Sequence, residues 1–153
     1  MRDQKLAVII ALGASPLVAC AGLTSAGLPS ERSIARLESQ LSMPSGAAPL
    51  DAYARYYAFT VPAHPEDAPF TTWTDGAVLP VGRQIVIGVF LKPEAWGNQP
   101  LGVHAVTLSE IPYAVHGGCW AVNVAYDPEA DRVLAVWCNV DENAAPPPPE
   151  GDF

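Results

Sequence analysis

Two apolar segments, residues 119–126 and 131–138, flank the polar sequence DPEA, and this arrangement constrains the fold more than any other feature of the chain. Segments of strand length on either side of a short polar turn predict a β-hairpin. If residues 127–130 form the loop, Tyr126 lies opposite Asp131. The pairing of every other position then follows, because a slip of one residue would move each side chain to the other face.

This register brings together two pairs of uncommon residues. Cys119 lies directly opposite Cys138, where Cβ atoms are about 4.5–5.5 Å apart and a disulfide needs only a small adjustment. On the other face Trp120 lies opposite Trp137. We expect the tryptophan face to belong to the core and the cysteine face to be more exposed. The other residues expected on the core face are Val122, Val124, Val133 and Ala135.

Strand patterns also mark the middle of the chain. Residues 84–91 (QIVIGVFL) are an almost unbroken apolar run of strand length, and residues 103–108 form a weaker strand. Between residues 60 and 82, four prolines exclude a continuous helix. The dipeptide Asp75-Gly76 in this region is typical of a tight hairpin turn.

Residues 53–59 (YARYYAF) fit two patterns. Tyr53, Tyr57 and Phe59 would share one face of a strand. A helix would instead gather Tyr53, Tyr56 and Tyr57 into one stripe. Aromatic enrichment favours the strand, although the helix stays open as an alternative.

A short helix is expected before this body. Ser30 is a suitable N-cap for a helix from Glu31 to about Ser42. The apolar residues of this helix form one narrow stripe, which either docks on the folded domain or leaves the segment mobile. The stripe consists of Ile34, Leu37 and Leu41. Residues 43–49 (MPSGAAP) are typical of a linker.

These patterns together predict a small α+β domain at residues 50–139, built on an antiparallel sheet of four or five strands. A proline-rich body of roughly 90 residues has limited apolar area to bury, so a disulfide should matter for its stability. Residues 140–153 contain four consecutive prolines among acidic and small residues. This composition predicts an extended, disordered tail that acts as a spacer, with a ligand for a proline-recognition module as the alternative.

The first twenty residues have the pattern of a secretory signal. Arg2 and Lys5 provide a basic start, and residues 6–19 are uncharged and too short to cross a bilayer, which needs about 20 apolar residues. The run ends in Leu17-Val18-Ala19-Cys20. This sequence resembles the lipobox of bacterial lipoproteins, in which the cysteine is lipidated and becomes the first mature residue. An ordinary signal peptide, with an incidental Cys20, is the alternative.

The resemblance implies a lipoprotein signal peptide at residues 1–19 and a lipidated tether at residues 20–49. Acyl chains on Cys20 would hold the protein on a membrane, because each buried CH₂ contributes about 0.8 kcal/mol. Residue Ala21 stands where, in Gram-negative lipoproteins, an aspartate favours retention in the inner membrane. The resemblance therefore favours the outer membrane, with the protein facing the periplasm.

Lipidation of Cys20 leaves Cys119 and Cys138 as a pair in an oxidising compartment, where disulfides persist. We therefore expect a structural disulfide between them. The alternatives are a redox-active pair and a nucleophilic Cys119 activated by His116. The two cysteines lack the CxxC spacing of dithiol oxidoreductases, which argues against the redox alternative.

The chain is acidic, with 8 basic and 16 acidic side chains. Removal of residues 1–19 would take away Arg2, Lys5 and Asp3 and leave 6 basic and 15 acidic side chains, a net charge near −9. Such a surface repels nucleic acid and anionic headgroups, because phosphate contacts require clustered lysine or arginine. We therefore expect no nucleic-acid partner, and a membrane link that depends on the lipid alone.

Motifs for metals, cofactors and catalysis are sparse. The three histidines, His64, His104 and His116, lack metal-binding spacing, and residues 64–67 (HPED) are more typical of an exposed turn. The acidic residues of the hairpin loop lack the glycine and glutamate that a calcium loop requires. These residues are Asp127, Glu129 and Asp131. With no GxSxG element and no glycine-rich phosphate loop, we expect no metal, no cofactor and no catalytic residue.

Five aromatic residues exceed what one small core needs, and they would either line a partner-facing surface or cover the core beneath long loops. They are Tyr53, Tyr56, Tyr57, Trp73 and Trp96. The expected function is therefore a non-enzymatic envelope lipoprotein that binds another protein or supports an assembly. An inhibitor of an exported hydrolase such as lysozyme is the alternative, with residues 60–82 and 92–102 as candidate acidic loops. A thiol enzyme that uses Cys119 and Cys138 is a third class.

Overall fold

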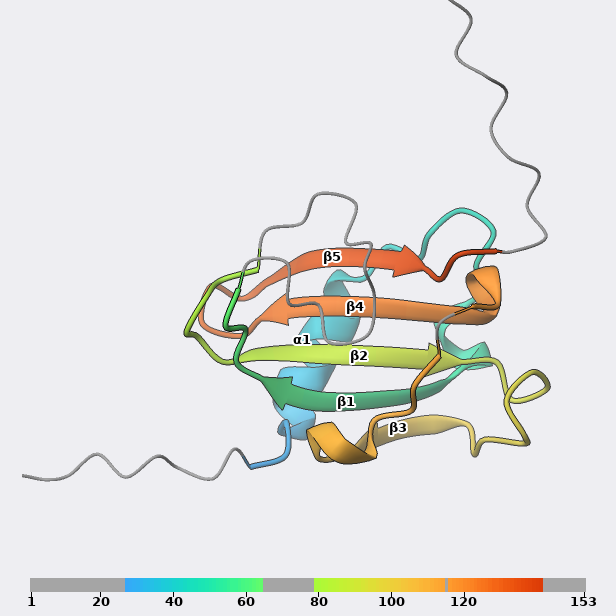
Figure 1. Cartoon of the computed structure of the whole chain (residues 1–153), viewed down its shortest axis with the longest axis horizontal. Helices are drawn as coiled ribbons and strands as arrows, with labels where there is room; N and C mark the ends of the chain where they lie inside the picture. The colour runs from blue at the N-terminus through green and yellow to red at the C-terminus, as the bar shows by residue number, and fades with distance from the viewer. Residues whose placement is uncertain (1–26, 65–78, 115, 142–153) are drawn as a thin grey trace, which may run out of the picture.

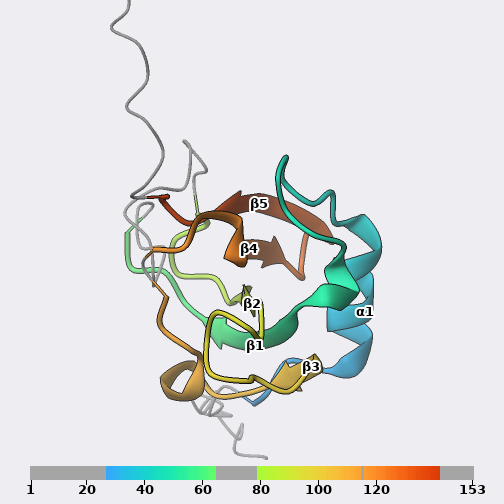
Figure 2. The same ribbon diagram turned by 90° about the vertical axis from the view of Figure 1, so that its right-hand side faces the viewer.

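The structure, a computed structural model, describes residues 27–64, 79–114 and 116–141. Within these ranges one α-helix packs against a five-stranded sheet (Figures 1 and 2), which confirms the expected α+β class. The helix is α1 (Glu31–Gln40), and the strands are β1 (Ala54–Thr60), β2 (Ile85–Leu91), β3 (Gly102–Ala105), β4 (Ala121–Asp127) and β5 (Arg132–Cys138). The short 3-10 helices are η1 (Leu50–Ala52), η2 (Leu108–Glu110) and η3 (Gly118–Trp120).

The sheet is mixed and has the strand order β3-β1-β2-β4-β5. The pairs β1–β2, β2–β4 and β4–β5 are antiparallel, whereas β1 and β3 are parallel. The expectation of a wholly antiparallel sheet is therefore wrong for β3. The reason is the loop at residues 92–101, which leaves β2 beside Ala54 and enters β3 beside the same residue. The chain thus starts β3 at the end where β1 starts, and the two strands run in the same direction.

Two ambiguous segments are settled by the structure. Residues 54–60 form strand β1, and Tyr53, Tyr57 and Phe59 share the face toward α1, as the strand pattern predicted. The weaker strand predicted at residues 103–108 is shorter than expected and ends at Ala105. It ends there because the Glu110 carboxylate accepts hydrogen bonds from the backbone and side chain of Thr107, forming a capping box that starts η2.

The β4–β5 hairpin forms, but in a different register from the predicted one. The closing pair is Asp127 with Arg132, one residue later than expected, and a bulge between Ala125 and Tyr126 shifts the pairing again. The loop moves because an Asp127 carboxylate oxygen accepts hydrogen bonds from the backbone N–H groups of Glu129 and Ala130, each at 3.0 Å. Side-chain chemistry of the turn therefore sets the register.

The new register changes where the cysteines and tryptophans lie. Val122, rather than Cys119, pairs with Cys138, and Cys119 belongs to η3 before the strand. The disulfide is nevertheless present, with a Cα–Cα distance of 4.6 Å between Cys119 and Cys138. Trp120 does not face Trp137 across the hairpin, and it is 52% exposed whereas Trp137 is 9% exposed. Its assignment to the core was wrong.

Both faces of the sheet carry buried clusters, so the expected contrast between a core face and an exposed face is wrong for β4. On the face that α1 covers, neighbouring side chains of the sheet require a glycine at position 88, because a Cβ on Gly88 would lie 2.5 Å from Val124 Cγ1. The largest buried residues on the α1 face are Tyr53, Tyr57, Phe90 and Tyr126. The opposite cluster includes Leu79, Ile87, Val89, Leu91, Ile111 and Trp137.

Helix α1 docks on the sheet through its apolar stripe, which answers the question the sequence left open. Ile34 is 2% exposed and Leu37 is fully buried. The Ser30 side chain accepts a hydrogen bond from the Ser33 backbone at 3.2 Å, confirming the predicted N-cap. In the described residues no helix is long and apolar enough to cross a membrane.

Polar contacts fix the helix at one register on the sheet. One Glu38 carboxylate oxygen accepts hydrogen bonds from Tyr57 Oη at 2.7 Å and from Arg55 Nη1 at 2.9 Å. Burial, and then this bond to Glu38, raise the pKa of Tyr57 far above its ordinary value, so the phenol stays protonated. At the end of the helix, Gln40 donates a hydrogen bond to Asp131 of the hairpin at 3.0 Å.

Candidate functional site: a tryptophan pocket beside the disulfide

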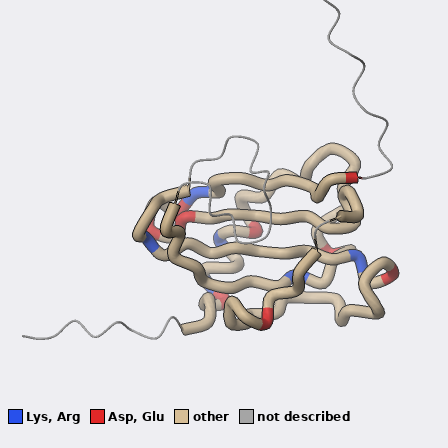
Figure 3. Tube along the Cα trace, viewed as in Figure 1, with Lys and Arg blue, Asp and Glu red and all other residues tan. Residues whose placement is uncertain are grey.

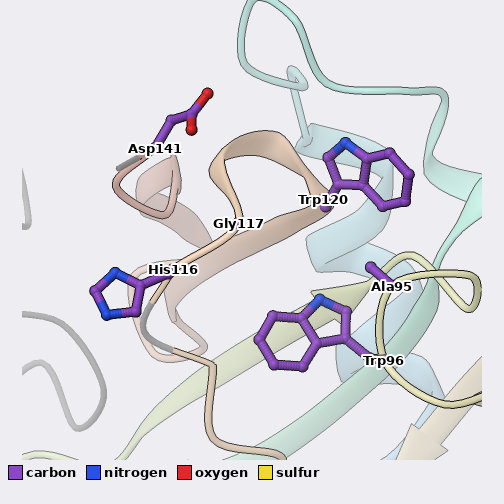
Figure 4. A pocket seen from close by; sticks show the side chains of 6 residues that line it. All are labelled: Ala95, Trp96, His116, Gly117, Trp120 and Asp141. Carbon is purple, nitrogen blue, oxygen red and sulfur yellow. The ribbon is translucent and has the colours of Figure 1, made fainter. Parts of the chain in front are cut away.

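A pocket of about 490 Å³ lies at the end of the sheet where the disulfide is found. Three separate segments build it: the loop after β2, the turn that leads into β4, and the residues that follow β5. Figure 4 shows the side chains that these segments contribute to its lining. We call this site the tryptophan pocket; its lining consists of Ala95, Trp96, His116, Gly117, Trp120 and Asp141.

The backbone around Trp120 is held on three sides. The disulfide ties Cys119 to the end of β5, and Tyr53 Oη donates a hydrogen bond to the Cys119 carbonyl at 2.7 Å. The Lys92 backbone N–H donates to the Trp120 carbonyl at 2.9 Å. The indole itself is half exposed. A large aromatic side chain is therefore presented to solvent from a rigid turn.

A pair of buried asparagines positions the opposite wall. Asn139 Nδ2 donates hydrogen bonds to the carbonyls of Ala114 at 2.7 Å and His116 at 3.2 Å. Its side-chain oxygen in turn accepts a hydrogen bond from Asn123 Nδ2 at 2.6 Å. Both asparagines are buried, at 3% and 6% exposure. Since buried amides are stable only when their partners are in place, this network fixes the carbonyls of Ala114 and His116 relative to the sheet.

The two glycines before Cys119 are required by this turn. Gly117 has φ +105° and Gly118 has φ +53°, both in the left-handed region that side chains disfavour. A Cβ on Gly117 would lie 3.5 Å from Trp96 Cζ2, an ordinary van der Waals contact, so it is the backbone conformation and not the space that favours glycine there. The Gly-Gly sequence thus serves both the chain reversal and the floor of the pocket.

Trp96 joins the pocket to the core. Its loop is closed by backbone hydrogen bonds from Asn98 to Pro93 at 3.0 Å and from Ala95 to Lys92 at 3.1 Å. The ring packs against the cluster beneath the sheet, and its Nε1–H is buried without a hydrogen-bond partner among the described residues. Trp96 is therefore both a cover over the core and a wall of the pocket.

The tryptophan pocket contains few charged side chains. Asp141 is the one carboxylate in its lining, and none of the six lining residues is a lysine or arginine. The nearest lysine in sequence, Lys92, has its Nζ 5.7 Å from the centre of the Tyr53 ring. Most charged residues of the described chain lie in loops and at strand ends, as Figure 3 shows. The lining of the pocket thus combines two indoles and an imidazole with one carboxylate.

The structure separates the candidate residues of the sequence. Cys119 and Cys138 are joined in the expected disulfide, so His116 stands beside a bonded sulfur and not a thiol. The ring of His104 stacks on that of Tyr56, with centroids 4.8 Å apart, away from the pocket lining. Across the described ranges no three metal-ligating side chains gather. Several candidates lie outside those ranges: Cys20, Glu66, Asp67, Trp73 and the Asp75-Gly76 turn.

The acidic residues of the hairpin loop stabilise the turn. Asp127 is 1% exposed, and its second oxygen accepts a hydrogen bond from Arg83 at 2.6 Å. Arg83 also contacts Glu129 at 3.2 Å. The Asp131 carboxylate accepts a hydrogen bond from Tyr126 at 2.5 Å, and burial together with this bond raises the pKa of Tyr126 to about 12.

The aromatic residues divide between the two predicted roles. Tyr53, Tyr56 and Tyr57 are buried and belong to the core, whereas Trp96 is shared between core and pocket. The sequence pattern placed Trp120 in the core and so missed its exposed position. It also missed the hydrogen-bonded pair Asn123 and Asn139. The signal for Trp120 was the preceding Gly-Gly, which marks a turn and not a strand.

Chemically, the tryptophan pocket can hold a ligand by stacking on two indoles, by ion pairing with a carboxylate and by hydrogen bonding to an imidazole. Its parts are fixed by a disulfide, a tyrosine and an amide pair before any ligand arrives. Comparisons of the whole chain with known proteins found no matching protein family, no matching curated protein and no matching solved structure.

Proposed function

We propose that this chain is a lipid-anchored cell-envelope protein that binds another protein through the tryptophan pocket and catalyses no reaction. The observation that carries the proposal is Trp120, half exposed on a turn that the disulfide holds. Tryptophan is enriched among the residues that dominate binding energy at protein interfaces. A side chain presented from a rigid turn loses little conformational freedom on binding, which favours affinity.

The anchor rests on the lipobox-like run that ends in Cys20. We expect the wild-type protein to sediment with membranes and to carry acyl chains at Cys20, with the outer membrane favoured. A Cys20→Ser variant should appear in the soluble fraction, because the membrane attachment then has no lipid. Intact mass of detergent-extracted protein and membrane fractionation measure both points. An unlipidated wild-type mass, or identical fractionation of the two proteins, contradicts the anchor.

The binding surface is tested by photo-cross-linking in intact cells. A photoreactive amino acid at position 95 keeps both indoles of the pocket, since Ala95 is an exposed lining residue. We expect a discrete protein adduct from position 95, and its loss when Trp120→Ala is added, because truncating an interface anchor of this kind costs about 2 kcal/mol or more. Leu108, which is 40% exposed on η2, is the matched control position. Equal adducts from both positions, or an adduct indifferent to Trp120→Ala, would place the partner elsewhere.

A second candidate is an inhibitor of a basic exported hydrolase such as lysozyme. The acidity of the chain and the absence of lysine and arginine from the pocket lining favour it. A turbidity assay with the purified mature protein separates this candidate from a general binding role. The thiol-enzyme alternative requires that Cys119 or Cys138 be alkylated without prior reduction, which intact mass also measures.

A further inference from the structure

We propose that the tryptophan pocket binds the guanidinium group of an arginine side chain on a basic partner protein. The inference rests on the proposed function, because it names the chemical group through which the partner would engage the same site. It follows from the chemistry of the residues that line the pocket.

The chemistry of the lining favours a positively charged ligand. The face of an indole attracts a positive charge within about 6 Å of the ring centroid, and tryptophan does so best among aromatic side chains. The pocket offers two indoles, Trp96 and Trp120, with Asp141 in the same lining and no lysine or arginine there. The formal net charge of the chain is −8, so its wider field also draws basic partners.

The arrangement of the walls favours arginine over lysine. Figure 4 shows Trp96 and Trp120 on one side of Gly117, with His116 and Asp141 on the other. A guanidinium is planar, stacks on an aromatic face, and directs its N–H groups outward in its own plane. A guanidinium that stacks on an indole therefore keeps its N–H groups for a carboxylate, and Asp141 is the carboxylate among the lining residues. A lysine ammonium would make the charge contact but has no planar face to stack.

The pocket is also prepared for a side chain of this kind. The indole of Trp120 is half exposed, so solvent already reaches a large part of it in the unbound protein. The opposite wall is fixed by the Asn123–Asn139 pair. Since neither wall has to fold on binding, the interaction avoids much of the ordering entropy that weakens flexible sites.

The test uses the mature protein, with its disulfide intact, and a blocked peptide that contains one arginine. Binding is followed by NMR through the indole Nε1–H signals. We expect saturable shifts of the Trp120 signal, weaker binding of the matched lysine peptide, and no binding of the citrulline peptide, which keeps the shape but not the charge. Added salt should weaken the arginine response, because Asp141 is exposed.

Variants locate the site. Trp120→Ala should weaken binding about tenfold, since a cation–π contact of this kind contributes on the order of 1–2 kcal/mol. Asp141→Asn should weaken it while keeping the side-chain shape. Leu108→Ala is the control and should leave the affinity unchanged. Because Trp120 and Asp141 are both exposed, these changes should not unfold the chain.

Several results would overturn the inference. If the citrulline peptide binds as tightly as the arginine peptide, the positive charge is not what the pocket recognises. If the lysine peptide binds as tightly, stacking of a planar group is not needed. Saturable shifts with a neutral disaccharide, in place of the arginine response, would make the pocket a saccharide site. A position-95 adduct in cells without any arginine response would leave the proposed function standing and reject the arginine. Binding of the arginine peptide without any adduct in cells would show that the pocket can hold a guanidinium and would reject the pocket as the site that binds a protein partner.

Discussion

Replacing Cys119 and Cys138 together by serine should lower the free energy of unfolding by about 3 kcal/mol. The two cysteines are 19 residues apart, and a cross-link over such a loop restricts the unfolded chain by roughly that amount. The loss is large for a domain of this size, since whole domains are stable by about 5–15 kcal/mol. Denaturant unfolding of the mature wild-type protein and the double variant measures it.

Reduction provides the matched control for this prediction. The wild-type protein in reductant should approach the stability of the double variant, while reductant should leave the double variant unchanged. Removing the disulfide should also loosen the turn that presents Trp120, because Cys119, the residue before it, is bonded to Cys138. Wild-type stability that is the same with and without reductant would show that the disulfide contributes little.

The sequence predicted the disulfide and the hairpin, but not the register that joins them. Pairing was counted from a loop at residues 127–130, whereas Asp127 uses its carboxylate to form a turn one residue later. A bulge beside Ala125 adds a further shift. Such shifts depend on local hydrogen bonds that alternation of apolar residues does not encode. Cys119 still reaches Cys138, because η3 turns the chain back toward β5.

The pocket could not be predicted for a related reason. Trp120 and Trp137 were both expected on paired strands, but Trp120 lies in η3 after Gly117-Gly118, and only Trp137 lies in a strand. Trp96 reaches the same place from a loop that is distant in sequence, because β2 ends beside the start of β4. Asn139 holds the wall through carbonyls more than twenty residues away. Contacts of this kind exist only after the strands have assembled.

The sequence also could not predict that β3 runs parallel to β1. Its short apolar pattern indicates a strand, yet a strand at the edge of a sheet can run either way. The path of the loop at residues 92–101 decides the outcome, by returning the chain to the start of β1. That same loop carries Trp96. The parallel pairing and the pocket therefore have one structural origin.

The docking of α1 gives the second large effect. We expect Leu37→Ala to lower the free energy of unfolding by about 2–5 kcal/mol, because a fully buried leucine loses its contacts and leaves a cavity. Arg32→Ala, at an exposed position of the same helix, is the matched control and should change stability little. Thermal or denaturant unfolding, followed by circular dichroism, measures both variants.

The outcome for Leu37 also sets the length of the tether. If Leu37→Ala destabilises the whole domain in a single transition, α1 is part of the folded unit that carries the pocket. The link from a lipidated Cys20 to the N-cap at Ser30 is then only residues 21–29, which span at most about 30 Å when fully extended. A loss of less than about 0.5 kcal/mol would instead mean that the helix can leave the sheet. In the first case the folded unit is held to the membrane by a short tether, so a partner would have to meet the protein near that membrane.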